Sequence, residues 1–136
     1  EQGLAEAQDN ILVHDAARCC LTAEALTRLL DEAGEKDEGG ILAIPVADTL
    51  KRSDGSHHIE ETVARAGLWQ AQTPQLFQTA LLHRALSVDD LSEITDEASA
   101  IEKLGIRPCL VQGDTRNLKL TLPQDEYIVR LLLKAV

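Results

Sequence analysis

An apolar segment that leads directly into a carboxylate and a guanidinium is the part of this sequence best suited to chemistry. The segment 11–14 has the composition of a buried strand, and Asp15 and Arg18 follow it with two alanines between them. In a parallel α/β sheet, ligands bind outside the carboxyl ends of the strands, so polar residues here are well placed for a site. Asp15 could supply oxygen to Mg²⁺, and Arg18 could hold phosphate. The alternative is an ordinary strand exit with a surface ion pair.

Basic side chains elsewhere in the chain could complete such a site. Together with Asp15 and Arg18, the residues Lys51, Arg65 and Lys119 suit magnesium and phosphate chemistry better than acyl transfer. For each basic residue taken alone, a solvated surface charge is the favoured explanation. The sequence has no Gly-x-Gly-x-x-Gly or Gly-x-x-x-x-Gly-Lys loop, no Gly-x-Ser-x-Gly nucleophile motif and no convincing pair of cysteine and histidine.

The acidic balance of the chain limits its partners. The 136 residues include 13 basic and 23 acidic side chains, which gives a formal net charge of −10. Nucleic-acid binding requires a basic surface that releases counterions, so no nucleic-acid partner is expected. For the same reason, an anionic substrate must be met by a local group of Arg and Lys.

The apolar runs and the cysteines bear on where in the cell the protein is located. The longest apolar runs, such as 131–133, are too short to span a bilayer, and the acidic residues 1–6 are unlike a signal peptide. We therefore expect no membrane association and a cytoplasmic location. The three cysteines, Cys19, Cys20 and Cys109, form neither a disulfide framework nor a metal-binding spacing, and are expected to be buried, reduced thiols.

The first half of the chain predicts an α/β fold. Thr22 is a good N-cap for a helix over 23–33, and Gly34 is a plausible stop. A short apolar strand over 41–44 follows, which completes a β-α-β unit with the strand at 11–13. Residues 46–66 then predict a polar hairpin around the turn 53–56. Because an isolated hairpin is marginal in water, it should pack on something, and a second subunit is favoured over the parent domain.

Three threonines predict helix starts in the second half. Thr73 and Pro74 have the types expected at the N-cap and the first position of a helix that continues through 80–82. Thr95 precedes acidic residues that suit the first turn of another helix. Thr121 has capping-box spacing ahead of a helix whose apolar face includes 127, 128, 131, 132 and 135. Strands are expected over 108–111 and 117–120.

Several motifs, taken in order, resemble one family. That family is the 2-C-methyl-D-erythritol 4-phosphate cytidylyltransferases of the non-mevalonate isoprenoid pathway. The similarity extends over nearly the whole chain and over the later part of the family's sequence. The motifs that carry it are His14-Asp15-Ala16-Ala17-Arg18, Pro45-Val46-Ala47-Asp48-Thr49-Leu50-Lys51, Arg65 with Gly67-Leu68-Trp69-Gln70-Ala71-Gln72-Thr73-Pro74-Gln75, Thr95-Asp96-Glu97-Ala98-Ser99-Ala100, and Asn117-Leu118-Lys119-Leu120-Thr121.

The resemblance implies a Rossmann-like nucleotidyltransferase sheet with flanking helices. Residues 1–136 would form part of that domain, and the hairpin 46–66 would be an arm that joins two copies into a homodimer. The family's glycine-rich CTP loop lies in an earlier segment that these residues do not include. Cys19 stands where family members often have proline, a change that would loosen the loop without removing a ligand.

The resemblance also implies a reaction and a place for each site residue. CTP would condense with 2-C-methyl-D-erythritol 4-phosphate to give the CDP-alcohol and pyrophosphate. Asp15 would bind Mg²⁺ beside the CTP phosphates, with Arg18 as a nearby electrostatic and positioning residue.

Five further residues would contact the methylerythritol phosphate. Thr73, Thr95 and Lys119 would do so from their own subunit, with Lys119 taking part in catalysis. Thr49 and Arg65 would come from the arm of the other subunit. Two alternatives stay open at this point: a cytidylyltransferase for another sugar-alcohol phosphate such as ribitol 5-phosphate, or an inactive fragment that acts as a dimerisation module.

Overall fold

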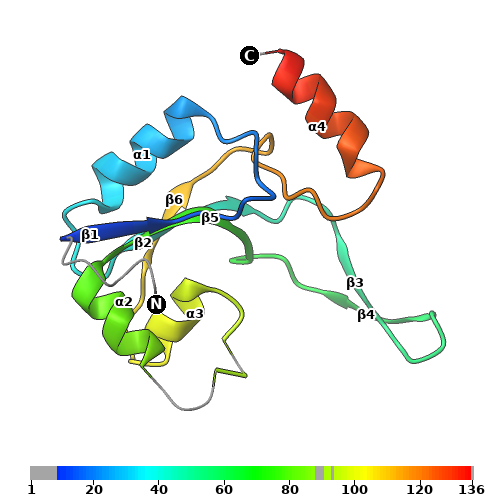
Figure 1. Cartoon of the computed structure of the whole chain (residues 1–136). Coiled ribbons are helices and arrows are strands. Elements are labelled where there is room, and N and C mark those ends of the chain that lie inside the picture. Colours follow the sequence, from blue (N-terminus) through cyan, green and yellow to red (C-terminus); the bar gives the residue numbers. More distant parts are fainter. Residues whose placement is uncertain (1–8, 88–90, 93, 136) are drawn as a thin grey trace.

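The computed structural model describes residues 9–87, 91–92 and 94–135 as a sheet with helices on both faces and a separate hairpin (Figure 1). The acidic segment 1–6 lies outside the described residues. Within the described part of the chain, no helix has the length and apolar character needed to cross a bilayer. The elements are β1 (Asn10–Val13), α1 (Ala23–Ala33), β2 (Gly40–Pro45), β3 (Leu50–Ser53), β4 (Ile59–Val63), β5 (Trp69–Gln78), α2 (Thr79–Leu86), α3 (Glu97–Glu102), β6 (Cys109–Gln112) and α4 (Asp125–Lys134).

The main sheet has the strand order β1-β5-β2-β6. β2 and β6 are parallel, whereas β5 runs antiparallel to both of its neighbours, β1 and β2. β1 and β2 therefore point the same way but are separated by β5. The predicted β-α-β unit exists, with a later strand inserted between its two strands.

Side chains along the strands point alternately to the two faces of the sheet, and each face has its own hydrophobic core. On one face, Leu42 and Leu76 pack with Leu29 of α1. On the other face, Ile41 and Phe77 pack with residues of α2 and α3. Because neighbouring strand residues point to opposite faces, one short apolar run serves both cores. This three-layer arrangement confirms the predicted α/β class, and Figure 1 shows α1 on one side of the sheet and α2 and α3 on the other.

β1 is less buried than its sequence suggests. It pairs with β5 alone and forms an edge of the described sheet, and its four residues are alternately exposed and half-buried. Leu12 is 42% exposed. The prediction of a buried strand at 11–13 was therefore correct about the strand and wrong about its burial in the described chain.

The helix predicted to begin at Thr73 and Pro74 is wrong. These residues lie within β5, the Thr73–Pro74 peptide is cis, and α2 begins only at Thr79. Residues 75–77 pair with β1, and two of them, Gln75 and Leu76, pair with β2 as well. These ladders and the two cores outweigh the local helix-start signal. Pro74 is accommodated because it lies in the irregular stretch of the β2–β5 pairing, where a missing N–H breaks no regular ladder.

The helix starts predicted at Thr22 and Thr95 lie at or within one residue of the observed N-caps. Thr22 does cap α1, because its hydroxyl accepts from the backbone N–H of Ala25 at 3.2 Å, and Gly34 follows the last helical residue. The N-cap of α3 is Asp96 instead of Thr95, since Asp96 and Ser99 form a reciprocal capping box. Residues 117–120 form no strand.

α4 begins later than predicted and is less covered. Its first residue is Asp125, whose carboxylate accepts from the backbone N–H groups of Thr121 at 3.1 Å and Leu122 at 2.8 Å. Val129 is the buried residue of this helix, whereas the predicted apolar face is largely exposed, with Tyr127 at 70%. Figure 1 shows the reason, because α4 lies beyond the layers that cover the sheet.

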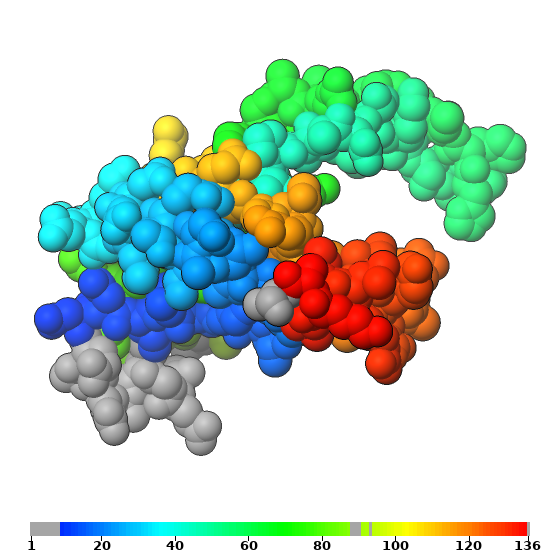
Figure 2. Space-filling view, turned by 90° about the horizontal axis from the view of Figure 1, so that it is seen from above, coloured from blue at the N-terminus to red at the C-terminus, as the bar shows by residue number. Residues whose placement is uncertain are grey.

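The hairpin predicted over 46–66 is present as β3 and β4. Its strands pair antiparallel from Leu50 opposite Val63 to Ser53 opposite Ile59. Almost every side chain of the two strands is exposed, including Ile59 at 66%. Figure 2 shows the hairpin reaching away from the rest of the described chain. We refer to residues 46–66 as the arm.

Gly39 provides a test of the packing at the start of β2. Its φ is +72°, and a Cβ added there would lie 2.4 Å from the Leu76 carbonyl oxygen and 2.4 Å from Cδ1 of Phe77. We expect Gly39→Ala to lower the free energy of unfolding by about 2–4 kcal/mol, through the strained backbone and the steric overlap. Chemical denaturation measures this.

Gly55→Ala is the matched control for that measurement. A Cβ at Gly55 would meet no atom within 4 Å, and its φ is not in the left-handed range. We expect Gly55→Ala to change stability by less than about 0.5 kcal/mol. Equal effects of the two substitutions would contradict the close approach at Gly39.

Candidate active site

Five of the seven predicted site residues line a single small cavity. The cavity has a volume of about 200 Å³ and opens between the carboxyl end of β1, the middle of β5 and the start of α3. Residues far apart in the sequence thus meet at one point. Its lining consists of Asp15, Arg18, Ala71, Gln72, Thr73, Gln75, Thr95, Asp96 and Lys119.

Thr73 joins β5 to the loop that follows β1. Its hydroxyl oxygen accepts from the backbone N–H of Asp15 at 2.9 Å and lies 2.9 Å from Nδ1 of His14. Nε2 of His14 lies 2.9 Å from the carbonyl oxygen of Arg18, which can only accept, so Nε2 carries the proton. In the neutral ring, Nδ1 then accepts the proton of the Thr73 hydroxyl. This network holds the 14–18 loop against β5.

Arg18 is held at the wall of the cavity by backbone carbonyls. It donates from Nη1 to the carbonyl of Asn117 at 2.8 Å and from Nη2 to that of Ala71 at 3.4 Å. Its Nε lies 3.4 Å from Oδ2 of Asp15, and its side chain is 13% exposed. The guanidinium therefore has a fixed direction and brings positive charge beside the Asp15 carboxylate.

Asp15 has the chemistry of a magnesium ligand. Its side chain is 40% exposed, and within the described chain its carboxylate has the single ion pair with Arg18. Mg²⁺ is commonly bound through one or two carboxylates together with substrate phosphates and water, so one accessible carboxylate in a phosphate site fits. The described residues contain no cluster of three or more His, Cys, Asp or Glu side chains that could hold a metal by themselves.

Thr95 and Lys119 reach the cavity from loops. The N–H of Thr95 is bound by the Ser99 hydroxyl at 3.0 Å, so the capping box of α3 orients Thr95 as well. Gln75 connects this loop to β5, because its side chain donates to Asp96 at 3.0 Å and accepts from the N–H of Ala98 at 2.9 Å. Lys119 is exposed and lies in the irregular segment after β6.

The remaining two predicted residues, Thr49 and Arg65, do not line this cavity. Both are exposed and lie at the base of the arm, where Nη1 of Arg65 donates to the carbonyl of Ala47. Within one copy of the chain, Thr49 and Arg65 therefore lie apart from the other five predicted residues. The sequence assigned Thr49 and Arg65 to a partner's site through the family resemblance, and their position in one copy fits that assignment.

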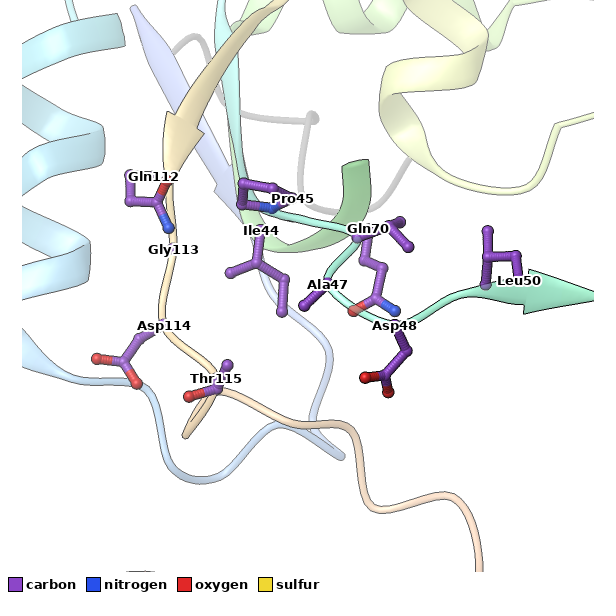
Figure 3. Close-up of a pocket in the computed structure, with 11 residues that line it drawn as sticks. Ile44, Pro45, Ala47, Asp48, Leu50, Gln70, Gln112, Gly113, Asp114 and Thr115 are labelled. Carbon is purple, nitrogen blue, oxygen red and sulfur yellow. The ribbon is translucent and has the colours of Figure 1, made fainter. Parts of the chain in front are cut away.

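Two larger hollows continue from the cavity toward the arm. One, of about 450 Å³, shares Arg18, Gln72 and Lys119 with the cavity. The next, of about 710 Å³, lies between the base of the arm and the loop after β6, with Asp48 on one side and Asp114 on the other (Figure 3). Hydrogen bonds from Arg116 hold the pKa of Asp114 down to about 2. The site cavity therefore lies at one end of a row of hollows that ends at the arm.

Three residues of this region were missed by sequence reasoning. His14 was inside a recognised motif, but one of its two hydrogen bonds depends on Thr73, which is 59 residues away. Gln75 and Asn117 are 1% and 0% exposed. A buried amide has no local sequence signature, so only the presence of both in the quoted family motifs could have drawn attention to them.

The cysteines differ in part from expectation. All three are free thiols, as predicted, but Cys19 is exposed, and Cys20 and Cys109 are only half-buried. Partial burial and the neighbouring Cys19 raise the pKa of the Cys20 thiol. The loop after Arg18 lies at the surface of the described chain, which explains why the predicted burial of Cys19 was wrong.

The chain is similar to proteins of one named family. The model of the family "IspD: 2-C-methyl-D-erythritol 4-phosphate cytidylyltransferase" matches residues 2–135. A curated relative of that name from Neisseria gonorrhoeae (strain NCCP11945) is 72% identical over the whole chain, and one from Thiobacillus denitrificans (strain ATCC 25259 / T1) is 57% identical over 92% of it. The chain covers 59% and 55% of these two relatives.

Solved structures give the same result. A crystal structure of a 4-diphosphocytidyl-2C-methyl-D-erythritol synthase, 70% identical, superposes with a TM-score of 0.88 over 97% of this chain and 60% of its own. The 2-C-methyl-D-erythritol 4-phosphate cytidylyltransferase of Thermus thermophilus, 31% identical, superposes with a TM-score of 0.86 over 96% of this chain and 64% of its own.

The α/β sheet with its site at the end of β1 has the Rossmann-like fold of a nucleotidyltransferase. The chain belongs to the 2-C-methyl-D-erythritol 4-phosphate cytidylyltransferase family. It spans about three fifths of the length of the curated relatives quoted above. Both of these curated relatives carry the name of the methylerythritol phosphate enzyme.

Proposed function

We propose that the protein carrying these residues transfers a cytidylyl group from CTP to 2-C-methyl-D-erythritol 4-phosphate and releases pyrophosphate. The observation that supports this most directly is the meeting of Asp15, Arg18, Thr73, Thr95 and Lys119 at one cavity in a member of this family. A carboxylate, two cationic groups and two hydroxyls in one small space suit a reaction between phosphates. We also propose a cytoplasmic location, which the three free cysteines fit.

The reaction would be an in-line displacement without a covalent enzyme intermediate. An oxygen of the methylerythritol phosphate attacks the α-phosphorus of CTP, and the bond from that phosphorus to the bridging oxygen of pyrophosphate breaks. Such a transfer depends on positioning and on neutralising charge at the phosphoryl oxygens. Arg18, with its fixed guanidinium, and Lys119, with its exposed ammonium, would supply that charge, while the hydroxyls of Thr73 and Thr95 would lie beside the substrate.

Asp15 would hold Mg²⁺ in this scheme. When bound there, the ion would neutralise phosphate charge and orient the CTP phosphates against the attacking oxygen. The half-exposed carboxylate and its position at the cavity support this role. Arg18 Nε, at 3.4 Å from Oδ2, holds positive charge beside that carboxylate.

The active unit would be a homodimer with two shared sites. Thr49 and Arg65 lie outside the cavity of their own copy, at the base of an exposed arm that reaches away from the body. In a two-fold dimer, the arm of each copy could bring these residues to the site of the other. The hollow of about 710 Å³ at the base of the arm offers room for such an approach.

The substrate is tested by following pyrophosphate release from CTP, with protein of the same length as the family relatives. We expect release with 2-C-methyl-D-erythritol 4-phosphate and little with ribitol 5-phosphate. Faster turnover of ribitol 5-phosphate would favour the alternative enzyme. No release with either phosphate would favour the dimerisation module.

Lys119 tests the proposed charge at the cavity. We expect Lys119→Ala to lower kcat/KM by about 30- to 900-fold, because loss of a phosphate-facing ammonium costs on the order of 2–4 kcal/mol. Steady-state kinetics with the methylerythritol phosphate measures this. Lys36→Ala removes an exposed ammonium outside the cavity and should change kcat/KM by less than about threefold. Equal, small effects of both substitutions would mean that Lys119 is a solvated surface charge.

A further inference from the structure

Asn117 is the point where three parts of the candidate site are joined. It is completely buried and lies two residues before Lys119. Its backbone carbonyl accepts from Arg18, and its side-chain Nδ2 donates to the carbonyl of Thr73 at 2.8 Å. One residue thus contacts the loop after β1, the middle of β5 and the segment that carries Lys119.

The same side chain also joins a longer chain of amides. Nδ2 of Asn117 lies 3.3 Å from Oε1 of Gln72, whose Nε2 donates to the carbonyl of Asp114 at 3.0 Å. The backbone N–H of Asn117 donates to the same carbonyl at 3.0 Å. The segment 114–119 is therefore attached to β5 at both Gln72 and Thr73, without being a strand itself.

The cost of burying Asn117 indicates what its side chain is for. Its Oδ1 is buried and has no hydrogen-bond partner among the described residues. An unpaired buried acceptor is unfavourable, so the side chain does not simply optimise stability. Its Nδ2, by contrast, fits two acceptors. Leucine could not donate to them, and aspartate would place an acceptor against the Thr73 carbonyl.

We propose that Asn117 is a positioning residue, which holds Arg18 and the Lys119 segment against the Thr73 stretch so that the phosphate-facing groups converge. This inference rests on the proposed cytidylyl transfer. It assigns Asn117 no contact with substrate. Its effect would pass through Arg18 and Lys119, and misplacement of catalytic groups by about 1 Å can cost about 100-fold in rate.

Kinetics of Asn117→Ala in the full-length protein tests this. We expect kcat to fall by about 100-fold, whereas the protein still unfolds cooperatively above the assay temperature. Asn10→Ala is the matched control, because Asn10 donates to the carbonyl of Gly34 on the exposed surface. Its kcat should stay within about twofold of the unmodified protein. If Asn117→Ala does not fold, Asn117→Ser, which keeps a shorter donor, replaces it.

A double-mutant cycle separates positioning from a merely structural role. If Asn117 acts through Lys119, then Asn117→Ala should cost at least tenfold less in the Lys119→Ala background than in the unmodified protein. Independent, multiplicative effects, or a kcat of Asn117→Ala close to that of the unmodified protein, would overturn the inference alone. Absence of pyrophosphate release by the unmodified protein would instead remove the proposed function, and the inference with it.

Discussion

Asp15→Asn is expected to abolish turnover while leaving the fold intact. The substitution keeps the size of the side chain but removes the charge that Mg²⁺ requires, so kcat should fall by about 10³-fold or more. The side chain is 40% exposed and lies at the end of β1, outside both cores, so the thermal midpoint should change little. Pyrophosphate release over a range of Mg²⁺ concentrations, together with thermal unfolding, measures both properties.

The control for this substitution is Asp31→Asn. Asp31 is an exposed residue of α1 that lies outside the cavity, and the same chemical change there should leave kcat within about twofold. Activity of Asp15→Asn close to that of the unmodified protein at low Mg²⁺ would exclude Asp15 as the metal ligand. The convergence of the other cavity residues would then need another explanation.

Mixing two inactive variants is expected to restore activity if the site is shared between subunits. Arg65→Ala and Asp15→Ala should each be inactive alone. In a mixed dimer, the Arg65→Ala copy keeps its own Asp15 and receives an intact Arg65 from its partner, so one of the two sites works. Random pairing makes about half of the dimers mixed, and activity should recover to about a quarter of the unmodified level.

The structure supports this design because Arg65 and Asp15 lie in different places in one copy. Asp15 lines the cavity, whereas Arg65 is exposed at the base of the arm. Native mass spectrometry of mass-labelled subunits would show that exchange has occurred. A mixture that stays inactive despite complete exchange would mean that Arg65 does not act across subunits, and that the arm has a structural role only.

The sequence by itself determined the parts of this protein that depend on local patterns. The N-cap Thr22 and the spacing of apolar residues after it specify α1, because capping and helical periodicity act within a few residues. The turn residues Ser53-Asp54-Gly55-Ser56 between two polar segments specify the arm in the same way. The carboxylate and guanidinium after β1, Asp15 and Arg18, could be placed at a strand end from the sequence alone, and in the structure they line the cavity.

Tertiary structure decided what local patterns left ambiguous. Thr73 and Pro74 have the types of a helix start, yet pairing with β1 and β2 places them in the central strand, because two ladders and two cores outweigh one local signal. The meeting of Asp15, Thr73 and Asn117 was also undetermined, because it depends on hydrogen bonds between residues 44 to 58 positions apart. These contacts form only when the whole sheet is assembled, because its strand order places β5 between β1 and β2.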